Sequence, residues 1–156
     1  MKNQEVKIVP YKAEYERAFV ELNRAWIEKY FCIEPADTAI FNSPEKTIIK
    51  KGGFIFCALV SGDVAGVCAL QKISTPKYEY ELSKLAVEPR YQGLGIGEKL
   101  CRAVVEKAQS LSEKKILIES NTKLTAAINL YKKLGFRETD SELNPNFSRV
   151  DIVLEL

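Results

Sequence analysis

The residues best suited to chemistry in this sequence form a glycine-rich turn, Gln92–Gly93–Leu94–Gly95–Ile96–Gly97. An apolar run that ends at Val87 precedes the turn, and a stretch with helical periodicity follows it. Glycines let the backbone approach a ligand closely, and the free N–H groups in the first turn of a helix attract an anion. A strand, a glycine turn and a helix in this order therefore predict a phosphate-binding site.

The sequence contains no histidine, which narrows the chemistry further. Ser–His–Asp and Cys–His catalysis are excluded, and the commonest metal ligand is missing. Acid–base steps would fall to carboxylates, tyrosine, lysine, cysteine or water. The four cysteines, Cys32, Cys57, Cys68 and Cys101, are widely spaced and form no Cys-x-x-Cys pair. We therefore expect reduced, mostly buried thiols and no metal site.

The length and composition limit the classes of protein to which this chain can belong. With 156 residues, 46% of them hydrophobic, we expect one α/β domain over residues 1–156 with a sizeable core. The 23 basic and 21 acidic residues leave a net charge of +2, which argues against a nucleic-acid partner. No apolar segment follows Met1, and the run Phe54–Val60 is far shorter than the roughly 20 residues that span a bilayer. We expect a cytoplasmic protein without membrane contact.

Hydrophobic periodicity indicates which elements position the glycine turn. In the first half it predicts a strand at Val6–Val9, an amphipathic helix over 13–30, a break over 31–42 around Pro35, and a shorter helix from Ser43–Pro44–Glu45. In the second half it predicts strands at 54–60 and 64–73 joined by Ser61–Gly62–Asp63, a strand at 78–87, a helix to about Ser112, a strand at 115–120, a helix from near Thr122 to Gly135, a short strand after Phe136, a loop at 144–146 and a last strand at 147–154.

Three known kinds of phosphate-binding turn could account for these glycines. A Walker A loop needs Lys where Glu98 stands. A Rossmann turn needs Gly or Ala at that same position, although Glu119 ends the next strand at a distance suited to a ribose and keeps this alternative open. The third pattern, Gln-x-x-Gly-x-Gly, is filled completely by Gln92–Gly97.

Through this third pattern the sequence resembles the GNAT superfamily of acetyl-CoA-dependent N-acetyltransferases. Leu85–Pro89 resembles the family's cofactor-binding strand and its exit, and Ala127–Phe136 is similar to its second signature. The resemblance implies a mixed, mostly antiparallel sheet of about six or seven strands, with a splayed central strand pair and about four helices. It implies a transferase that moves acetyl from acetyl-CoA to a primary amine by direct attack in a ternary complex, without a metal.

The resemblance also implies which residues bind the cofactor. The backbone N–H groups of Gln92, Gly93, Leu94, Gly95, Ile96 and Gly97 would hold the coenzyme A pyrophosphate. The backbone of Leu85, Ala86 and Val87 would lie along the pantetheine arm. The Val87 N–H would then polarise the thioester carbonyl. Some of the glycines could instead serve helix–strand packing.

Two residues are the expected catalytic groups. Tyr131 corresponds to the family's general acid, although a buried structural tyrosine would occupy the same apolar stripe. Glu81 lies at the position of a carboxylate base found in some members, with Glu79, Glu119 or water as alternatives. At Leu124 the family often has an asparagine that contacts pantetheine; neither Asn121 nor Asn129 is assigned that contact.

The acceptor amine is not identified by the sequence. Its binding is expected from the first two helices and the late strands, which offer Trp26, Tyr30, Phe31, Glu34, Asp37, Tyr78, Tyr80 and Phe147. Aromatic rings with Glu34 and Asp37 would suit a cationic amine. A non-catalytic acyl-CoA-binding module is the alternative function, and a homodimer is left open.

Overall fold

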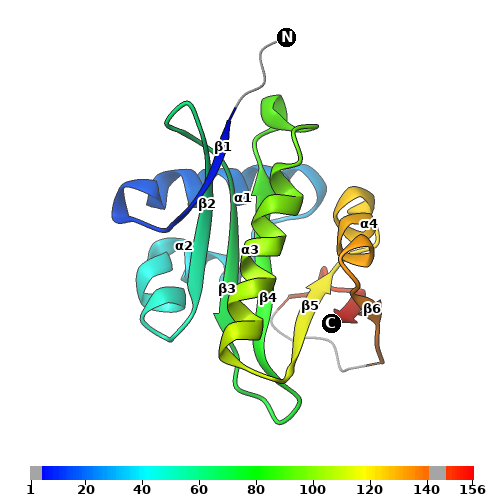
Figure 1. The fold of residues 1–156 in the computed structure, drawn as a ribbon. Helices are drawn as coiled ribbons and strands as arrows, with labels where there is room; N and C mark the ends of the chain where they lie inside the picture. Colours follow the sequence, from blue (N-terminus) through cyan, green and yellow to red (C-terminus); the bar gives the residue numbers. More distant parts are fainter. Residues whose placement is uncertain (1–4, 141–146) are drawn as a thin grey trace.

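The computed structural model describes residues 5–140 and 147–156 (Figure 1). Their elements in chain order are β1 (Val6–Pro10), a 3₁₀ turn η1 (Ala13–Tyr15), α1 (Glu16–Tyr30), α2 (Pro35–Asn42), a π-helical turn η2 (Glu45–Ile49), β2 (Phe54–Val60), β3 (Asp63–Lys72), β4 (Tyr78–Val87), a 3₁₀ turn η3 (Pro89–Tyr91), α3 (Ile96–Leu111), β5 (Lys115–Ser120), α4 (Thr125–Lys133), β6 (Arg137–Glu138) and β7 (Ile152–Glu155).

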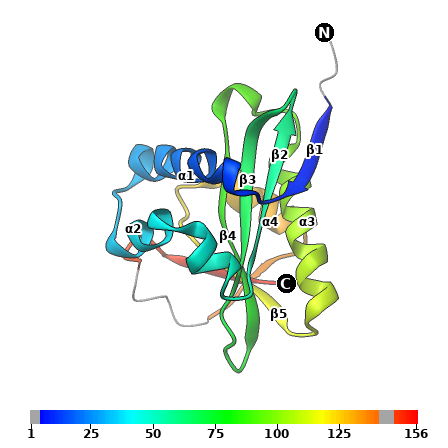
Figure 2. The ribbon, with the colours of Figure 1, turned by 90° about the vertical axis from the view of Figure 1, so that its left-hand side faces the viewer.

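A seven-stranded sheet in the order β1-β2-β3-β4-β5-β7-β6 forms the middle layer. Every neighbouring pair is antiparallel except β4 and β5, which are parallel and joined through α3. Helices α1 and α2 cover one face of the sheet and α3 covers the other (Figure 2). The expected mixed, mostly antiparallel α/β architecture is confirmed.

Each face of the sheet buries its own apolar cluster, as alternation along the strands requires. Leu100 and Val104 of α3 pack with Ile118 and Leu154 on one face. Phe19 and Ile27, two turns apart on α1, pack with strand residues on the other face. Because both faces are covered, the central strands β3 and β4 are rigidly held, which suits a site built on them.

The parallel pair β4–β5 is splayed. Its only paired positions in the described structure are Tyr78 with Lys115 and Glu81 with Leu117. Beyond Glu81 the two strands have no further register partners, although β4 continues to Val87 and stays paired with β3. The strand edge of β4 toward β5 is therefore open along its second half, as expected from the family resemblance.

A bulge in β4 changes which side chains face α1 and α2. Between the pairs Val67–Ala86 and Ala69–Ser83, two residues of β4 oppose one of β3, and Lys84 adopts a left-handed φ of 55°. Side-chain alternation is thereby shifted by one residue, so that Lys84 lies on the same face as Ser83. The bulge supplies a charged side chain to that face.

The prediction over 31–42 was wrong. Pro35 does not interrupt structure but begins α2, since its fixed φ and missing N–H suit the first helical position. Glu34 and Asp37 complete a capping box, in which the Glu34 N–H donates to Asp37 Oδ2 at 3.0 Å. The second expected helix, from residue 43, is only the π-helical turn η2.

Two further boundaries differ from the predictions. Helix α4 begins at Thr125 rather than near Thr122, because Thr122 pairs with Asp151 through both its N–H and its hydroxyl group. The last strand is Ile152–Glu155, and residues 147–151 run outside the sheet toward α2. The predicted loop at 144–146 lies outside the described residues. Within residues 5–140 and 147–156, no helix has both the length and the apolar character of a membrane span.

Candidate active site

A cavity of about 1180 Å³ runs through the protein at the splay between β4 and β5. The glycine turn, the start of α3 and α4 line one part of it, and α1, α2 and residues 147–150 line the other. We call these the turn side and the helix side. The floor common to both is the second half of β4, from Glu81 to Val87.

On the turn side, the backbone conformation of the loop requires glycine. Gly93 and Gly95 have φ of 88° and 75°, in the left-handed region, and a Cβ added to either would meet no atom within 4 Å. Both glycines line the cavity, and the space beside them is open. Gly95 is the N-cap of α3, whose first N–H groups have no side-chain cap. Free donors at a helix N-terminus beside open space are suited to a phosphate.

Gly97 has a different role from the other two glycines. A Cβ at Gly97 would lie 3.4 Å from Leu130 of α4, so this position allows α3 and α4 to pack closely. The next residue, Glu98, bonds Lys133 of α4 at 2.6 Å and Arg102 of its own helix at 3.1 Å. These contacts fix the turn relative to α4.

The open edge of β4 presents a backbone donor to the cavity. The Glu88 N–H donates to the carbonyl oxygen of Ala65 on β3, at 2.8 Å. Since successive N–H groups of an extended chain point in opposite directions, the Val87 N–H points toward the splay. Leu85, Ala86 and Val87 all line the cavity.

Tyr131 of α4 reaches the turn side from the core. It is 6% exposed, lines the cavity, and packs against Phe136 with ring centroids 6.2 Å apart. Gly135, with φ of 104°, ends the helix and lets the Phe136 N–H donate to the Tyr131 carbonyl oxygen at 3.0 Å. Burial, together with Cys101 and Cys68, raises the pKa of Tyr131 well above 10. Its hydroxyl group is therefore a proton donor at neutral pH.

Two carboxyl groups meet on the floor of the cavity. Glu81 of β4 and Glu119 of β5 both line it, and they lie close enough for the charge of Glu119 to act on Glu81. Burial and the charge of Glu119 raise the pKa of Glu81 to about 8, while the nearby Lys84 opposes the shift. Two carboxyl groups in such contact hold one proton between them near neutral pH.

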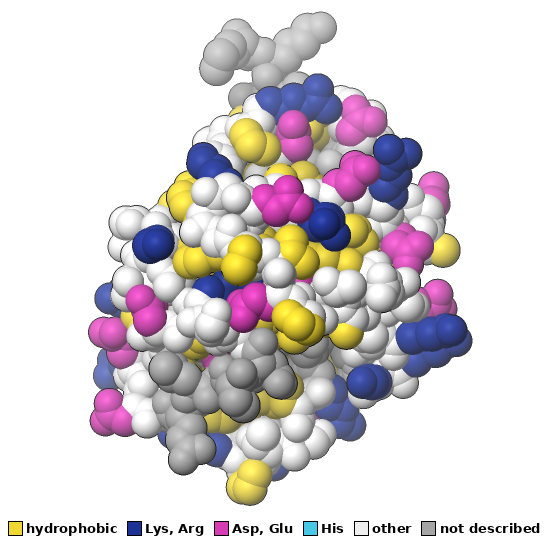
Figure 3. All heavy atoms as spheres, turned by 180° about the vertical axis from the view of Figure 1, so that it is seen from behind, with side chains coloured by type: hydrophobic (Ala, Val, Ile, Leu, Met, Phe, Trp, Pro, Cys, Tyr) yellow, Lys and Arg dark blue, Asp and Glu magenta, His cyan; other side chains and the backbone are white. Residues whose placement is uncertain are grey.

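On the helix side, the walls are mainly apolar. Leu22, Ala25 and Trp26 of α1 face Ala36 and Ile40 of α2 across the cavity. Figure 3 shows this face of the molecule, with apolar side chains gathered across its middle and charged ones around them.

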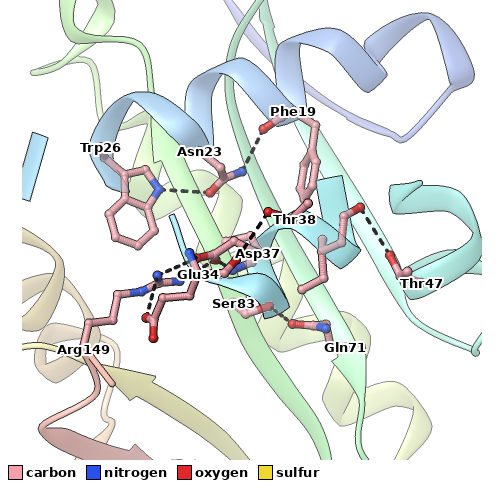
Figure 4. A network of polar contacts seen from close by, with 12 residues as sticks. Phe19, Asn23, Trp26, Glu34, Asp37, Thr38, Thr47, Gln71, Ser83 and Arg149 are labelled. Atoms are coloured by element: carbon pink, nitrogen blue, oxygen red, sulfur yellow. Dashed lines mark hydrogen bonds and ion pairs between the residues drawn. The ribbon is translucent and has the colours of Figure 1, made fainter. Parts of the chain in front are cut away.

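A buried network of ion pairs lies next to the helix side of the cavity (Figure 4). Asp37, which is 0% exposed, accepts from Lys84 Nζ at 3.0 Å and from both terminal nitrogens of Arg149, at 2.7 and 2.6 Å. Burial by itself raises the pKa of Asp37, but Arg149 and Lys84 outweigh it and hold the pKa at about 2. Glu34 binds Ser148 and Arg149, so residues 147–150 are tied to α2.

One comparison decides the family. A family model described as the Acetyltransferase (GNAT) family matches residues 13–136. The chain belongs to the GNAT acetyltransferase family. It is 30% identical over 105 residues to N-acetyltransferase 8B of Mus musculus, an alignment that covers 65% of this chain and 45% of that protein. The chain thus spans about half the length of the curated relatives it matches.

Solved structures agree with this GNAT fold. A GNAT-family acetyltransferase of Staphylococcus aureus superposes with a TM-score of 0.85 at 20% identity, covering 97% of this chain and 98% of that one. YncA of Salmonella typhimurium, solved with its cofactor acetyl-CoA, superposes with a TM-score of 0.72 at 19% identity, covering 97% and 93%. At such identities the likeness establishes the fold of the GNAT chain.

Most of the site residues expected from the sequence of this GNAT protein lie around the same cavity. Glu81, Tyr131, residues 85–87 and all of Gln92–Gly97 except Leu94 line the cavity. Leu94 is 42% exposed and is not among the lining residues. Among the alternatives to Glu81, Glu119 lines the cavity, whereas Glu79 lies outside the lining and faces Lys72 and Lys114 at 3.7 and 3.6 Å.

Half of the expected acceptor residues face the cavity. Trp26, Tyr30, Phe31 and Phe147 line it, whereas Glu34, Asp37, Tyr78 and Tyr80 do not. Trp26 is oriented by its ring N–H, which donates to Asn23 at 3.0 Å (Figure 4). The carboxylates of Glu34 and Asp37 bind residues of the chain itself, so the expected direct contact of Asp37 with a cationic amine is wrong.

Sequence reasoning missed Lys84 and Arg149. A signal for Lys84 is present: apolar residues alternate through Tyr80 and Leu82 and then resume out of phase at Leu85 and Val87. Such a phase shift indicates a bulge at the residue between them. No comparable pattern marks Arg149, because its partners come from α2, more than a hundred residues earlier. Leu124 lines the cavity, and Asn121 instead donates to the Arg149 carbonyl oxygen at 2.7 Å.

Proposed function

We propose that this GNAT protein transfers an acetyl group from acetyl-CoA to a primary amine by direct attack within a ternary complex. The observation that carries the proposal is the convergence, on one cavity, of a glycine turn, an open strand edge, a protonated tyrosine and a carboxyl pair. Acetyl-CoA would supply the acetyl group as an activated thioester. Each of the chain's own groups then has a distinct role.

The turn side is suited to the cofactor. The N–H groups of Gln92–Gly97 would bind its pyrophosphate, since Gly93 and Gly95 leave the space beside them open. The open edge of β4 would bind the pantetheine arm like an added strand, and Val87 N–H would donate to the thioester carbonyl oxygen. The structure of YncA with acetyl-CoA, which shares this fold, supports the assignment.

Glu81 and Glu119 would act together as the base. An alkylamine is mostly protonated at neutral pH, because its pKa lies near 10.4, and must lose a proton before it attacks. The pair holds one proton near neutral pH, so its remaining carboxylate would accept the proton from the amine, and Glu81 itself would become a base as the pH rises through about 8. The amine nitrogen then forms the new bond to the acetyl carbon and the carbon–sulfur bond breaks, and the second proton that the nitrogen loses would restore the Tyr131 hydroxyl group once Tyr131 has protonated the thiolate.

Tyr131 would donate its proton to the departing thiolate. Its hydroxyl group stays protonated at neutral pH because burial raises its pKa. The cysteines beside it, Cys68 and Cys101, are fully buried and do not line the cavity. Tyr91 also lines the cavity on the turn side, but of these two phenols Tyr131 is the buried one.

The test is a transfer assay with acetyl-CoA and a panel of primary amines, followed by mass spectrometry of the products. The wild type should acetylate at least one amine, and Tyr131→Phe should lower kcat by about tenfold or more while the affinity for acetyl-CoA is kept. Tyr80→Phe is the matched control, because Tyr80 belongs to the same core cluster, is 7% exposed and lies outside the cavity lining.

Two outcomes would contradict the proposal. Tight acetyl-CoA binding without transfer to any amine would indicate a non-catalytic acyl-CoA-binding module. Equal turnover in Tyr131→Phe and Tyr80→Phe would make Tyr131 a structural residue.

A further inference from the structure

Lys84 is a buried cation with spare hydrogen-bond donors. Its side chain is 6% exposed, and it lines the cavity. Among the residues that the structure describes, Asp37 is its only hydrogen-bond acceptor, at 3.0 Å. An ammonium group has three N–H donors, so two of them are not used by these residues. The rings of Phe41 and Phe147, at 5.8 and 4.8 Å, attract the charge without accepting an ordinary hydrogen bond.

Asp37 is the counter-ion of Lys84, but its carboxylate is shared with other donors. The same carboxylate accepts two hydrogen bonds from Arg149 and one from the Glu34 N–H. Since desolvated donors without acceptors are costly, a ligand oxygen that reached Lys84 would be strongly favoured.

The position of Lys84 relative to Glu81 defines where that oxygen would lie. Both residues come from the same strand, and the bulge brings Lys84 onto the face that Glu81 and Ser83 occupy. The two side chains are close enough to influence each other's charge. An amine beside Glu81 therefore has the Lys84 ammonium next to it, where an oxygen near the amine could bind.

The remaining walls of the helix side are mainly apolar, and the charged side chains that line them, Lys29 and Arg149, are cationic. Leu22 and Trp26 of α1 and Ala36 and Ile40 of α2 line the same cavity as Lys84 and Glu81. No carboxylate other than Glu81 and Glu119 is among the described lining residues of this side. A polycationic acceptor would thus find few partners, whereas an apolar side chain would be desolvated there.

We propose that Lys84 binds a carboxylate or carbonyl oxygen of the acceptor, and that the acceptor is an α-amino compound with an apolar side chain. Its amine would lie at Glu81, its oxygen at Lys84 and its side chain between α1 and α2. This inference rests on the proposed acetyl transfer and names its substrate class. A free amino acid and the N-terminus of a peptide both carry this chemistry.

The experiment compares three amines that share one side chain: L-phenylalanine, L-phenylalaninamide and 2-phenylethylamine. The first has a carboxylate, the second has only a carbonyl oxygen, and the third has neither. Their kcat/KM values are measured at saturating acetyl-CoA with the wild type, Lys84→Met and Lys84→Arg. The amines differ in their own pKa, so the decisive quantity is the change in their ratios between enzymes.

The wild type should favour at least one oxygen-bearing amine over 2-phenylethylamine by about tenfold to a hundredfold, the usual effect of a hydrogen bond to a charged group. Lys84→Met should lower kcat/KM for the oxygen-bearing amine more than for 2-phenylethylamine, so that the preference is lost, and Lys84→Arg should retain part of the preference. A preference for phenylalanine indicates a free amino acid, and one for the amide indicates a chain N-terminus.

Other outcomes overturn the inference. If the wild type uses 2-phenylethylamine as well as the other two, or if Lys84→Met lowers all three kcat/KM values equally, Lys84 has only a structural role. If Lys84→Met fails to fold, the change in the ratios between the wild type and Lys84→Arg still tests the inference. Acetyl-CoA binding without transfer to any amine contradicts the proposed function instead, which separates the two failures.

Discussion

Two carboxyl groups from different strands meet on the floor of the cavity, and their contact has a thermodynamic cost. Glu81 has a pKa of about 8 in the folded protein, raised from 4.5 by burial and by Glu119. In the unfolded chain the two side chains are hydrated and apart, so the pKa returns to its ordinary value. The raised pKa of Glu81 therefore lowers the free energy of unfolding at neutral pH, as is common where acid–base chemistry is needed.

This cost predicts a pH dependence of the free energy of unfolding. Between pH 4.5 and about 8 the folded state holds more protons at Glu81 than the unfolded state does, so stability falls as the pH rises. Glu81→Gln should remove this decline, and its stability relative to the wild type should increase from pH 5 to pH 8.5. Urea unfolding across this range measures the effect.

Glu79→Gln is the matched control for that measurement. Glu79 lies on the same strand but outside the cavity lining, near Lys72 and Lys114. Its pH profile should run parallel to that of the wild type. Parallel profiles for Glu81→Gln as well would show that the carboxyl pair does not hold its proton as described.

At the scale of elements, the strand–turn–helix unit from β4 to α3 could be predicted from the sequence almost to the residue. The reason is that its signals are local: alternation in Tyr78–Val87, glycines in the turn and 3.6-residue periodicity in the helix. Helix α2 was not predicted, although Pro35 and the Glu34–Asp37 capping box are local signals for its start. The course of residues 147–151 was not predicted, because it is fixed by an ion network with a segment distant in the sequence.

The glycine turn gives a prediction at this scale. Gly95→Leu should abolish or weaken coenzyme A binding by about a hundredfold, because a side chain would occupy the open space beside the N–H donors. Gly62→Leu is the control, since Gly62 also has a positive φ, of 83°, with nothing within 4 Å, but lies in the β2–β3 hairpin. Both variants should lose similar stability, about 1–2 kcal/mol, through backbone strain.

Isothermal titration with coenzyme A and thermal unfolding of both variants check this. The assignment of the turn would be contradicted if Gly95→Leu bound coenzyme A like the wild type. It would also be contradicted if Gly62→Leu lost binding to the same extent.

For the whole molecule, the arrangement of layers explains why one cavity can serve two ligands. The sheet is covered by α3 on one face and by α1 and α2 on the other (Figure 2), and the second half of β4 has no register partner on β5. A ligand on the turn side and one on the helix side can thus meet at the second half of β4. The strand order of the sheet agrees with membership of the GNAT family.

The most direct measurement is a crystal structure of the wild type with acetyl-CoA bound. We expect the pyrophosphate on the N–H groups of Gln92–Gly97 and the thioester carbonyl oxygen within hydrogen-bond distance of Val87 N–H. We also expect the sulfur beside the Tyr131 hydroxyl group and the acetyl group facing Glu81. A thioester that lies outside the splay, away from both Tyr131 and Glu81, would contradict the account.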